Sequence, residues 1–253
     1  MRSFLSAISF LTIIPVPHRY AVERTNLSKT SIFFPVVGLL IGLFVSGIGY
    51  LLYHIFPAQV ATIFVVALLA SASGALHLDG LADTCDGFLS ARPRDKVLAI
   101  MRDSRVGTMG VVGIIFLVII KWTSLTNVSA GARWATIVLM PLTGRTALLV
   151  MMALLPYARS EGGLASAFLG HNGLKWWGVC IGIVLLVIIS IMGFGRVGVI
   201  ITATSLGVIL VFCGYCYGKI GGYTGDTLGA ICEISEVLPA LMALVILRGG
   251  GAL

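Results

Sequence analysis

Three aspartates stand close together in the segment HLDGLADTCDGF, residues 77–88. Asp79, Asp83 and Asp86 are four and then three residues apart, so a helix turning about 100° per residue carries all three on a stripe about 60° wide. Carboxylates held this close repel one another unless a cation neutralises them, and Mg²⁺ prefers oxygen ligands, usually one or two carboxylates with substrate phosphates. A solvated helix end explains one or two acids, but not three on one stripe. The spacing therefore predicts a metal site, with His77 on another face of the helix as a hydrogen-bonding residue.

A second acidic group follows in the string TGDTLGAICEISE. Asp226, Glu233 and Glu236 are seven and then three residues apart, which places them within an arc of about 80° on a helix. We predict that they are further metal ligands. Ionisable groups inside an apolar helix are costly and are functional candidates by default. The two glutamates could instead pair with Arg145 or Lys121, and the sequence leaves this alternative open.

Arginines and glycines occur near both acidic groups. In the string RDSRVGTMG, Arg102 and Arg105 flank Asp103 and precede Gly107. Guanidinium groups suit phosphate oxygens, so we predict that this string binds substrate. Arg145 lies in the middle of an apolar stretch, where it should face the protein interior and either a carboxylate or an anionic substrate.

The glycines just before the second acidic group are a weaker signal. Gly221, Gly222 and Gly225 suit a loop whose backbone amides approach phosphate. Elsewhere, glycines four residues apart, such as Gly38 and Gly42, predict close packing between membrane helices of the same chain.

The composition shows what kind of protein positions these residues. The chain has 253 residues, of which 58% are hydrophobic and 11% charged, whereas soluble domains carry about 25% charged residues. This excludes an ordinary soluble enzyme, a disordered chain, a coiled coil and a disulfide scaffold. The net charge of +7 comes from dispersed Lys and Arg residues, which is typical of a membrane protein and not of a nucleic-acid-binding surface.

The apolar stretches predict an all-α, polytopic helical bundle with about six to eight membrane segments, formed by one transmembrane domain over residues 1–253. Residues 3–16 are too short to span a bilayer comfortably, so we expect an interfacial or re-entrant segment there. The predicted spans are residues 31–56, 58–78, 107–125, 133–155, 176–195 and 197–217, with a last helix at 227–247.

Charge distribution predicts the orientation of the bundle. Four connecting stretches, residues 17–30, 79–106, 156–175 and 218–226, hold 11 of the 17 basic residues and eight of the ten acids. Basic loops stay in the cytoplasm. We therefore expect the chemistry at the cytoplasmic face of a bacterial inner membrane.

Two acidic groups with adjacent arginines indicate metal-assisted phosphoryl transfer to or from a diphosphate-linked substrate. An alternative from a different functional class is an ion-coupled transporter. It would use Glu233, Glu236 and Arg145 as charges at the membrane midplane. The position of the first aspartate group at a helix end disfavours the transporter.

The strings at residues 77–88, 102–110 and 224–236, together with FFPVVGLLIG at 33–42, resemble the cobalamin synthase family in order and spacing. The resemblance implies a Mg²⁺-dependent adenosylcobinamide-GDP ribazoletransferase. Such an enzyme joins adenosylcobinamide-GDP to α-ribazole, or to its 5′-phosphate, and releases GMP in the nucleotide-loop assembly step of cobalamin biosynthesis. A CDP-alcohol phosphotransferase-like enzyme is a related alternative, but the strings are those of cobalamin synthase.

Applied to this chain, the resemblance implies that a ribazole hydroxyl attacks the phosphorus attached to cobinamide while the first aspartate group holds Mg²⁺. Asp86, Asp226 and Glu233 are the expected catalytic residues, with one of the last two as a second metal ligand or general base. Arg102 and Arg105 would hold phosphate oxygens. The expected partners are the two substrates and the lipid bilayer, with no nucleic acid. A homo-oligomer and association with other enzymes of the cobalamin pathway both remain open.

Overall fold

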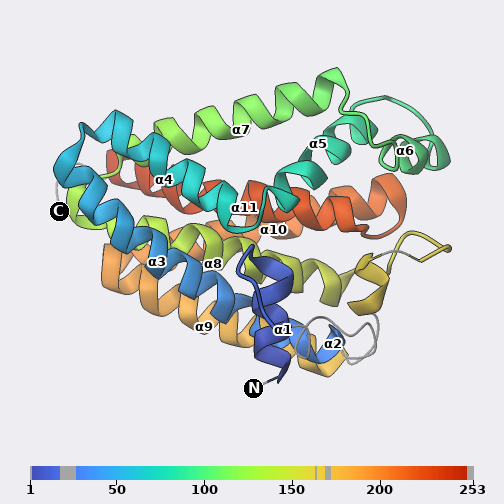
Figure 1. The fold of residues 1–253 in the computed structure, drawn as a ribbon, viewed down its shortest axis with the longest axis horizontal. Helices are drawn as coiled ribbons and strands as arrows, with labels where there is room; N and C mark the ends of the chain where they lie inside the picture. The colour runs from blue at the N-terminus through green and yellow to red at the C-terminus, as the bar shows by residue number, and fades with distance from the viewer. Residues whose placement is uncertain (1, 18–26, 163, 169–171, 250–253) are drawn as a thin grey trace.

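The computed structural model describes residues 2–17, 27–162, 164–168 and 172–249, and these residues form helices and no named strand. The predicted all-α polytopic fold is confirmed (Figure 1). The helices, with η for 3₁₀ helices, are α1 (Arg2–Leu11), α2 (Leu27–Thr30), η3 (Ser31–Phe33), α3 (Phe34–Ile55), α4 (Ala58–Ala72), α5 (Leu76–Phe88), α6 (Arg94–Ile100), α7 (Thr108–Asn127), α8 (Ala130–Leu154), η4 (Leu164–Phe168), α9 (Asn172–Phe194), α10 (Val197–Ile220) and α11 (Gly225–Gly249).

Helix α8 forms the centre of the bundle. Its residues from Ala135 to Met152 are buried without interruption, which includes Arg145. A helix that is buried all round needs neighbours on every side, and α8 accordingly lies among α3, α9 and α11. By contrast, α7 leaves large apolar side chains such as Phe116 exposed, as expected for a surface that faces lipid.

Glycines allow α3 to approach α8 closely, as the sequence predicts. A side chain at Gly38 would come within 2.6 Å of the Pro141 carbonyl oxygen, and one at Gly42 within 2.7 Å of Val138. These two helices therefore make backbone contact across a seam that larger residues would separate.

Six helices of the described residues are long and apolar enough to cross a membrane, and they match all but one of the predicted stretches. The exception is the predicted span at 58–78. Helix α4 ends at Ala72, and the chain turns by 88° before α5 begins. Gly74 and Ala75 both adopt the left-handed backbone conformation, which no regular helix contains. The span is therefore broken, and the aspartate segment belongs to a helix of its own.

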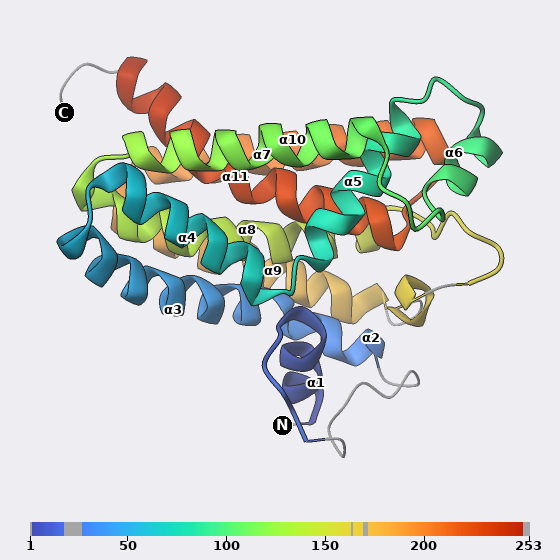
Figure 2. The same ribbon diagram turned by 45° about the horizontal axis from the view of Figure 1, so that its top comes forward.

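Helix α1 has only 10 residues, which is too short to span a bilayer. It crosses the long helices at a steep angle and packs against them with Ala7 and Leu11 fully buried (Figures 1 and 2). A backbone hydrogen bond of 2.9 Å from Ile13 to Ala72 ties its end to the break between α4 and α5. The position agrees with the expected short segment that does not span the membrane.

The connections rich in charge meet at one end of the bundle. Helix α6, the segment after α8 and the turn between α10 and α11 all lie at the same end in both views (Figures 1 and 2). The turns that join α3 to α4, α7 to α8 and α9 to α10 lie at the opposite end. The polar residues of the predicted site are thus brought to one face.

Candidate active site

The first aspartate group lies on α5, as the helical spacing predicts, and Asp226 of α11 joins it. Asp83 is half-buried and lies close enough to feel the charges of Asp79, Asp86 and Asp226. The two helices meet at glycines: a side chain at Gly80 would come within 2.8 Å of the Asp226 carbonyl oxygen. Because Gly80 is on the α5 turn beside Asp79 and Asp83, this close approach brings the aspartates of α5 and α11 together.

Asp86 has a structural partner that the sequence did not indicate. Its Oδ2 accepts a 2.7 Å hydrogen bond from the Gly107 backbone N–H, and its Oδ1 accepts one of 2.9 Å from the Gly110 N–H. The carboxylate therefore caps the N-terminus of α7, where free amides and the helix dipole both favour negative charge. The Gly107 amide is engaged by Asp86, so the structure gives this predicted substrate-binding residue a protein partner. Each Asp86 oxygen keeps a second lone pair, which leaves the predicted metal-binding role compatible with capping.

An Asp86→Asn variant should therefore lose stability. Asparagine can accept one of the two amide hydrogen bonds but turns an NH₂ group toward the other, which costs about 1–2 kcal/mol in the free energy of unfolding. Thermal unfolding in detergent without Mg²⁺ measures this, and Asp83→Asn, where no hydrogen bond of the described residues is lost, is the matched control. Equal unfolding temperatures for the two variants would contradict the capping role.

Arg159 is a site residue that no sequence pattern indicates. Its Nη2 donates a 2.7 Å hydrogen bond to Asp226 Oδ2, with both side chains mostly buried. The segment that carries Arg159 is held beside α11 by two backbone hydrogen bonds of 2.9 Å, from Ala158 to Tyr223 and from Tyr223 to Pro156. No motif signals this contact, because it depends on a bridge between segments that are far apart in the chain.

The arginines of the second string lie at the exposed surface of the same end. Arg105 binds Asp103 through its side chain, at 2.7 and 3.1 Å, and through its backbone N–H. Hydrogen bonds from the Arg105 side chain, and then from its backbone, lower the pKa of Asp103 to about 2. Arg102 pairs at 2.7 Å with Glu161. Both guanidinium groups are thus held by exposed carboxylates that a phosphate can replace without a large desolvation cost.

Of the three glycines at the turn into α11, two are required by the backbone conformation or by close packing. Gly221 ends α10 with a φ of +76°, and a side chain at Gly222 would collide with the Pro156 carbonyl oxygen. Gly225 has only distant neighbours and borders a cavity that Asp79 and Asp226 also line. Of the predicted phosphate-approaching glycines, Gly225 is the one that the structure leaves open to a ligand.

Glu233 and Glu236 lie deeper in α11 and are paired with buried cations. Lys121 Nζ lies 2.6 Å from one oxygen of each glutamate, and Arg145 binds the other oxygen of Glu236. All four side chains are at most 4% exposed. Two positive and two negative charges neutralise each other, which is the alternative that the sequence left open. The glutamates thus have the lysine and arginine partners of that alternative, and Arg145 has a carboxylate, one of the two kinds of partner predicted for it. Metal binding by the glutamates and substrate binding by Arg145 stay predictions.

The aspartates do not form a closed metal cage. Across the described ranges, no three His, Cys, Asp or Glu side chains are grouped so that they hold a metal ion as they stand. Mg²⁺ does not require such a cage, since it keeps several waters and takes one or two carboxylates with substrate phosphates. The convergence of Asp79, Asp83 and Asp226, all carboxylates, therefore fits a cation that is bound together with a phosphorylated substrate.

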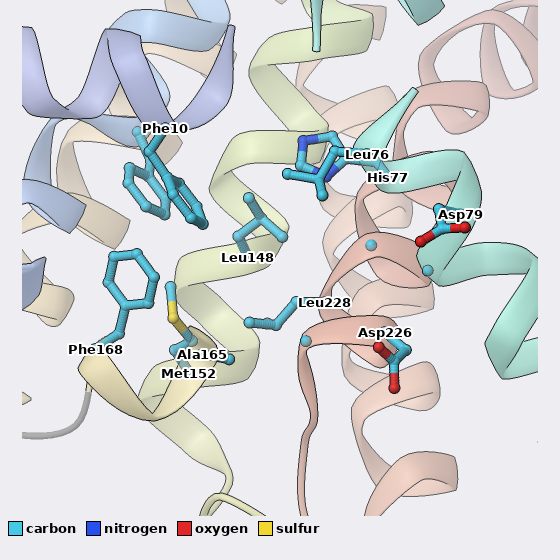
Figure 3. A pocket seen from close by; sticks show the side chains of 14 residues that line it. Phe10, Leu76, His77, Asp79, Leu148, Met152, Ala165, Phe168, Asp226 and Leu228 are labelled. Carbon is cyan, nitrogen blue, oxygen red and sulfur yellow. The ribbon is translucent and has the colours of Figure 1, made fainter. Parts of the chain in front are cut away.

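A cavity of about 170 Å³ opens beside these aspartates (Figure 3). Asp79 and Asp226 lie on one side of it, and Phe10 and Phe168 on the other. His77 of α5 also borders the cavity, and its imidazole, which the sequence assigned to another face of the helix, is 4% exposed. The remaining lining is mainly apolar and comes from α3, α5, α8, η4 and α11, at residues Phe34, Leu76, Gly80, Leu148, Met152, Ala165, Gly225, Leu228 and Gly229.

The sequence places the chain in a family. A sequence model described as cobalamin-5-phosphate synthase matches residues 3–245. The chain belongs to the cobalamin-5-phosphate synthase family. The resemblance seen in the sequence strings and the prediction of an enzyme are thereby confirmed.

Three curated relatives of this cobalamin-5-phosphate synthase family member carry the name adenosylcobinamide-GDP ribazoletransferase. The protein of Geotalea daltonii is 36% identical over 98% of this chain and 99% of its own. The Acetivibrio thermocellus protein is 36% identical over 93% of this chain and 94% of its own, and the Clostridium acetobutylicum protein 35% identical over 98% of both. No solved structure matches the chain.

Proposed function

We propose that this enzyme joins adenosylcobinamide-GDP to α-ribazole, or to its 5′-phosphate, and releases GMP in a Mg²⁺-dependent reaction. The observation that carries the proposal is the convergence of aspartates from α5 and α11 beside a cavity at the charged end of a membrane bundle. This arrangement supplies cation ligands, a space for an acceptor and arginines within one region. The names of the relatives supply the two substrates.

The proposed roles follow from where each side chain lies. Asp79 and Asp83 would hold Mg²⁺, with Asp86 joining them from its capping position and Asp226 left free to act as the base. Bound Mg²⁺ would neutralise the diphosphate and stabilise the charge of the departing GMP. Arg102 and Arg105 would exchange their exposed carboxylate partners for phosphate oxygens.

The transfer itself needs a base and a leaving group. Asp226 borders the cavity and is our candidate to accept the proton of the ribazole hydroxyl. The hydroxyl oxygen forms a bond to the phosphorus attached to cobinamide, and the bond between this phosphorus and the bridging oxygen breaks. GMP leaves with the bonding electrons. Arg159, which now binds Asp226, would keep that carboxylate ionised and oriented.

We further propose that the site faces the cytoplasm of a bacterial cell. The connections at this end, residues 79–106, 156–175 and 218–226, hold eight of the 17 basic residues, whereas the turns at 57, 126–132 and 196 hold one, and basic loops stay on the cytoplasmic side. One transferase domain over residues 1–253 remains a prediction. The buried glutamates and Arg145 neutralise one another within the protein. They give no support to the alternative of an ion-coupled transporter, which requires charges that a transported ion can reach.

The direct test is an assay of the purified protein in detergent with adenosylcobinamide-GDP and α-ribazole. GMP and the corrinoid product should form in equal amounts with Mg²⁺, and chelation should abolish both because the diphosphate loses its counter-ion. Parallel reactions with α-ribazole 5′-phosphate identify the preferred acceptor. Ion-driven uptake into proteoliposomes without GMP release would overturn the proposal in favour of a transporter.

A further inference from the structure

The cavity beside Asp79 and Asp226 is small and largely apolar, with a cluster of phenylalanines on one side. Its volume is about 170 Å³. Pockets that enclose whole drug-sized ligands are larger, at roughly 300 to 1000 Å³. Phe10, Phe34 and Phe168 pack against one another with ring centroids 5.0–5.9 Å apart. Such a space suits one flat, apolar ring system more than an entire nucleotide.

His77 gives the cavity one further polar group. Apart from the two aspartates, it is the one polar side chain among the described residues that line the cavity. Its Nε2 is buried and has no hydrogen-bond partner within the described part of the chain. Since buried polar atoms are nearly always hydrogen-bonded, an unpartnered Nε2 on a side chain that borders a cavity indicates that a ligand supplies the partner.

We propose that this cavity binds the heteroaromatic base of ribazole, with an imidazole N–H of His77 donating a hydrogen bond to the unsubstituted ring nitrogen. The proposal rests on the proposed function, because ribazole is its acceptor substrate. The base is a methylated benzimidazole: two fused flat rings, apolar except for one nitrogen that accepts a hydrogen bond. Bound there, it would leave the ribose, with its hydroxyls, on the side of Asp79 and Asp226.

The other parts of the two substrates fit the cavity poorly. The corrin ring is far larger than this space. Guanine is of suitable size but has several donors and acceptors on its edge. The aspartates that could accept from its donors are assigned to Mg²⁺ and to the ribazole hydroxyl, and the phenylalanines, Leu148 and Met152 offer its edge no partners. Burying unpaired polar groups costs about 1–3 kcal/mol each. The guanosine and corrin ends of the donor substrate therefore belong outside the cavity.

A filling substitution tests where ribazole binds. Leu148→Trp places a larger side chain in the cavity and should raise the KM for α-ribazole roughly tenfold or more. The KM for adenosylcobinamide-GDP should change less than about twofold, since the donor lies outside. Leu40→Trp is the matched control, because Leu40 borders a separate apolar groove between α1, α3 and α4. Gel filtration of both variants checks that they remain folded.

An analogue tests the hydrogen bond without changing the cavity. In equilibrium dialysis, the wild-type protein should bind the α-ribazole analogue with C–H in place of the free ring nitrogen roughly tenfold more weakly than α-ribazole itself. His77→Phe should bind both compounds with nearly equal affinity, because it has no donor to lose. Equal affinity in the wild type would remove His77 from the proposal.

The outcomes separate this inference from the proposed function. If the wild type releases GMP but Leu148→Trp leaves the KM for α-ribazole unchanged, the cavity assignment is wrong and the transferase stands. If the wild type releases no GMP with either acceptor, the proposed function itself fails. A Leu148→Trp variant that raises only the KM for adenosylcobinamide-GDP would place the donor substrate in the cavity and overturn the inference.

Discussion

An Asp83→Asn variant should release GMP roughly 10²–10³-fold more slowly than the wild type while remaining folded. Asp83 lies amid Asp79, Asp86 and Asp226 and feels the charge of each. Asparagine has the same shape, but it removes one of the negative charges that attract Mg²⁺. The expected loss is therefore one of cation binding and charge stabilisation, and excess Mg²⁺ should restore part of the rate.

The same substitution should not destabilise the protein. Asp83 makes no hydrogen bond among the described residues, and its carboxylate is repelled by its three neighbours when no cation is present. Removing this charge relieves the repulsion, so the unfolding temperature without Mg²⁺ should be equal to that of the wild type or higher. Asp83→Asn should thus lower the rate of GMP release without lowering the stability of the protein. Asp86→Asn would change both, because it also removes the cap of α7.

The matched control is Asp95→Asn at the same end of the bundle. Asp95 is exposed on α6, and its one ion pair with another described residue is a 3.6 Å contact with Arg94. It should keep the full rate of GMP release and the same dependence on Mg²⁺. Wild-type activity in Asp83→Asn, measured beside this control, would show that the aspartates of α5 do not hold the cation.

The sequence predicts the helix that carries the aspartates because the relevant pattern is local. Asp79, Asp83 and Asp86 share a face through the period of a single helix, which depends on no other part of the chain. The break before this helix is also local, but its signal is weak. Gly74 lies in an apolar stretch, and a single glycine there does not by itself indicate that the helix breaks. The left-handed conformation of Ala75 has no signature in its residue type, because a residue with a Cβ rarely adopts it.

The residues that the sequence did not reveal depend on tertiary contacts. Arg159 reaches Asp226 only because Tyr157 bridges to Tyr223, and Asp86 caps α7 only because α5 and α7 pack together. Both roles require knowing which helix ends meet. Helical period and charge distribution predict which face is polar, but they do not predict which partners share it.

Glu233 and Glu236 show the same limit: the helical period predicts their face but not their partners. On the helical period alone, Glu233 and Glu236 extend the face that begins with Asp226, which predicts metal ligands. A helix rises about 1.5 Å per residue, so Glu236 lies far along α11 from Asp226. There it meets Lys121 of α7. An acid in an apolar helix indicates that a partner exists; the packing of α7 and α8 against α11 determines that the partner is a cation of the protein.

Lys121→Met should cause a large loss of stability. This variant leaves Glu233 without its cation in a buried site, while Glu236 keeps Arg145. Breaking a buried pair by removing one partner costs roughly 3–5 kcal/mol, because an uncompensated charge remains in the interior. The unfolding temperature in detergent and the monodisperse fraction on gel filtration should both fall clearly.

Two controls distinguish the loss of the buried ion pair from the effect of removing any lysine. Lys96→Met, on the exposed face of α6, should unfold like the wild type. Adding Glu233→Gln to Lys121→Met should recover part of the stability, since the double variant no longer buries an unpaired carboxylate. If Lys121→Met alone were as stable as the wild type, the glutamates would not depend on Lys121 for neutralisation.

The same variants decide whether Glu233 takes part in the reaction. Neither Lys121 nor Glu233 is among the described residues that line the cavity beside Asp79 and Asp226. At a temperature where the double variant is folded, its rate of GMP release should therefore stay within about tenfold of the wild-type rate. This is well short of the roughly 10²–10³-fold loss expected for Asp83→Asn. A loss as large as that of Asp83→Asn would support the predicted catalytic role of Glu233, because a structural ion pair acts on stability and leaves the chemistry of a folded site largely intact.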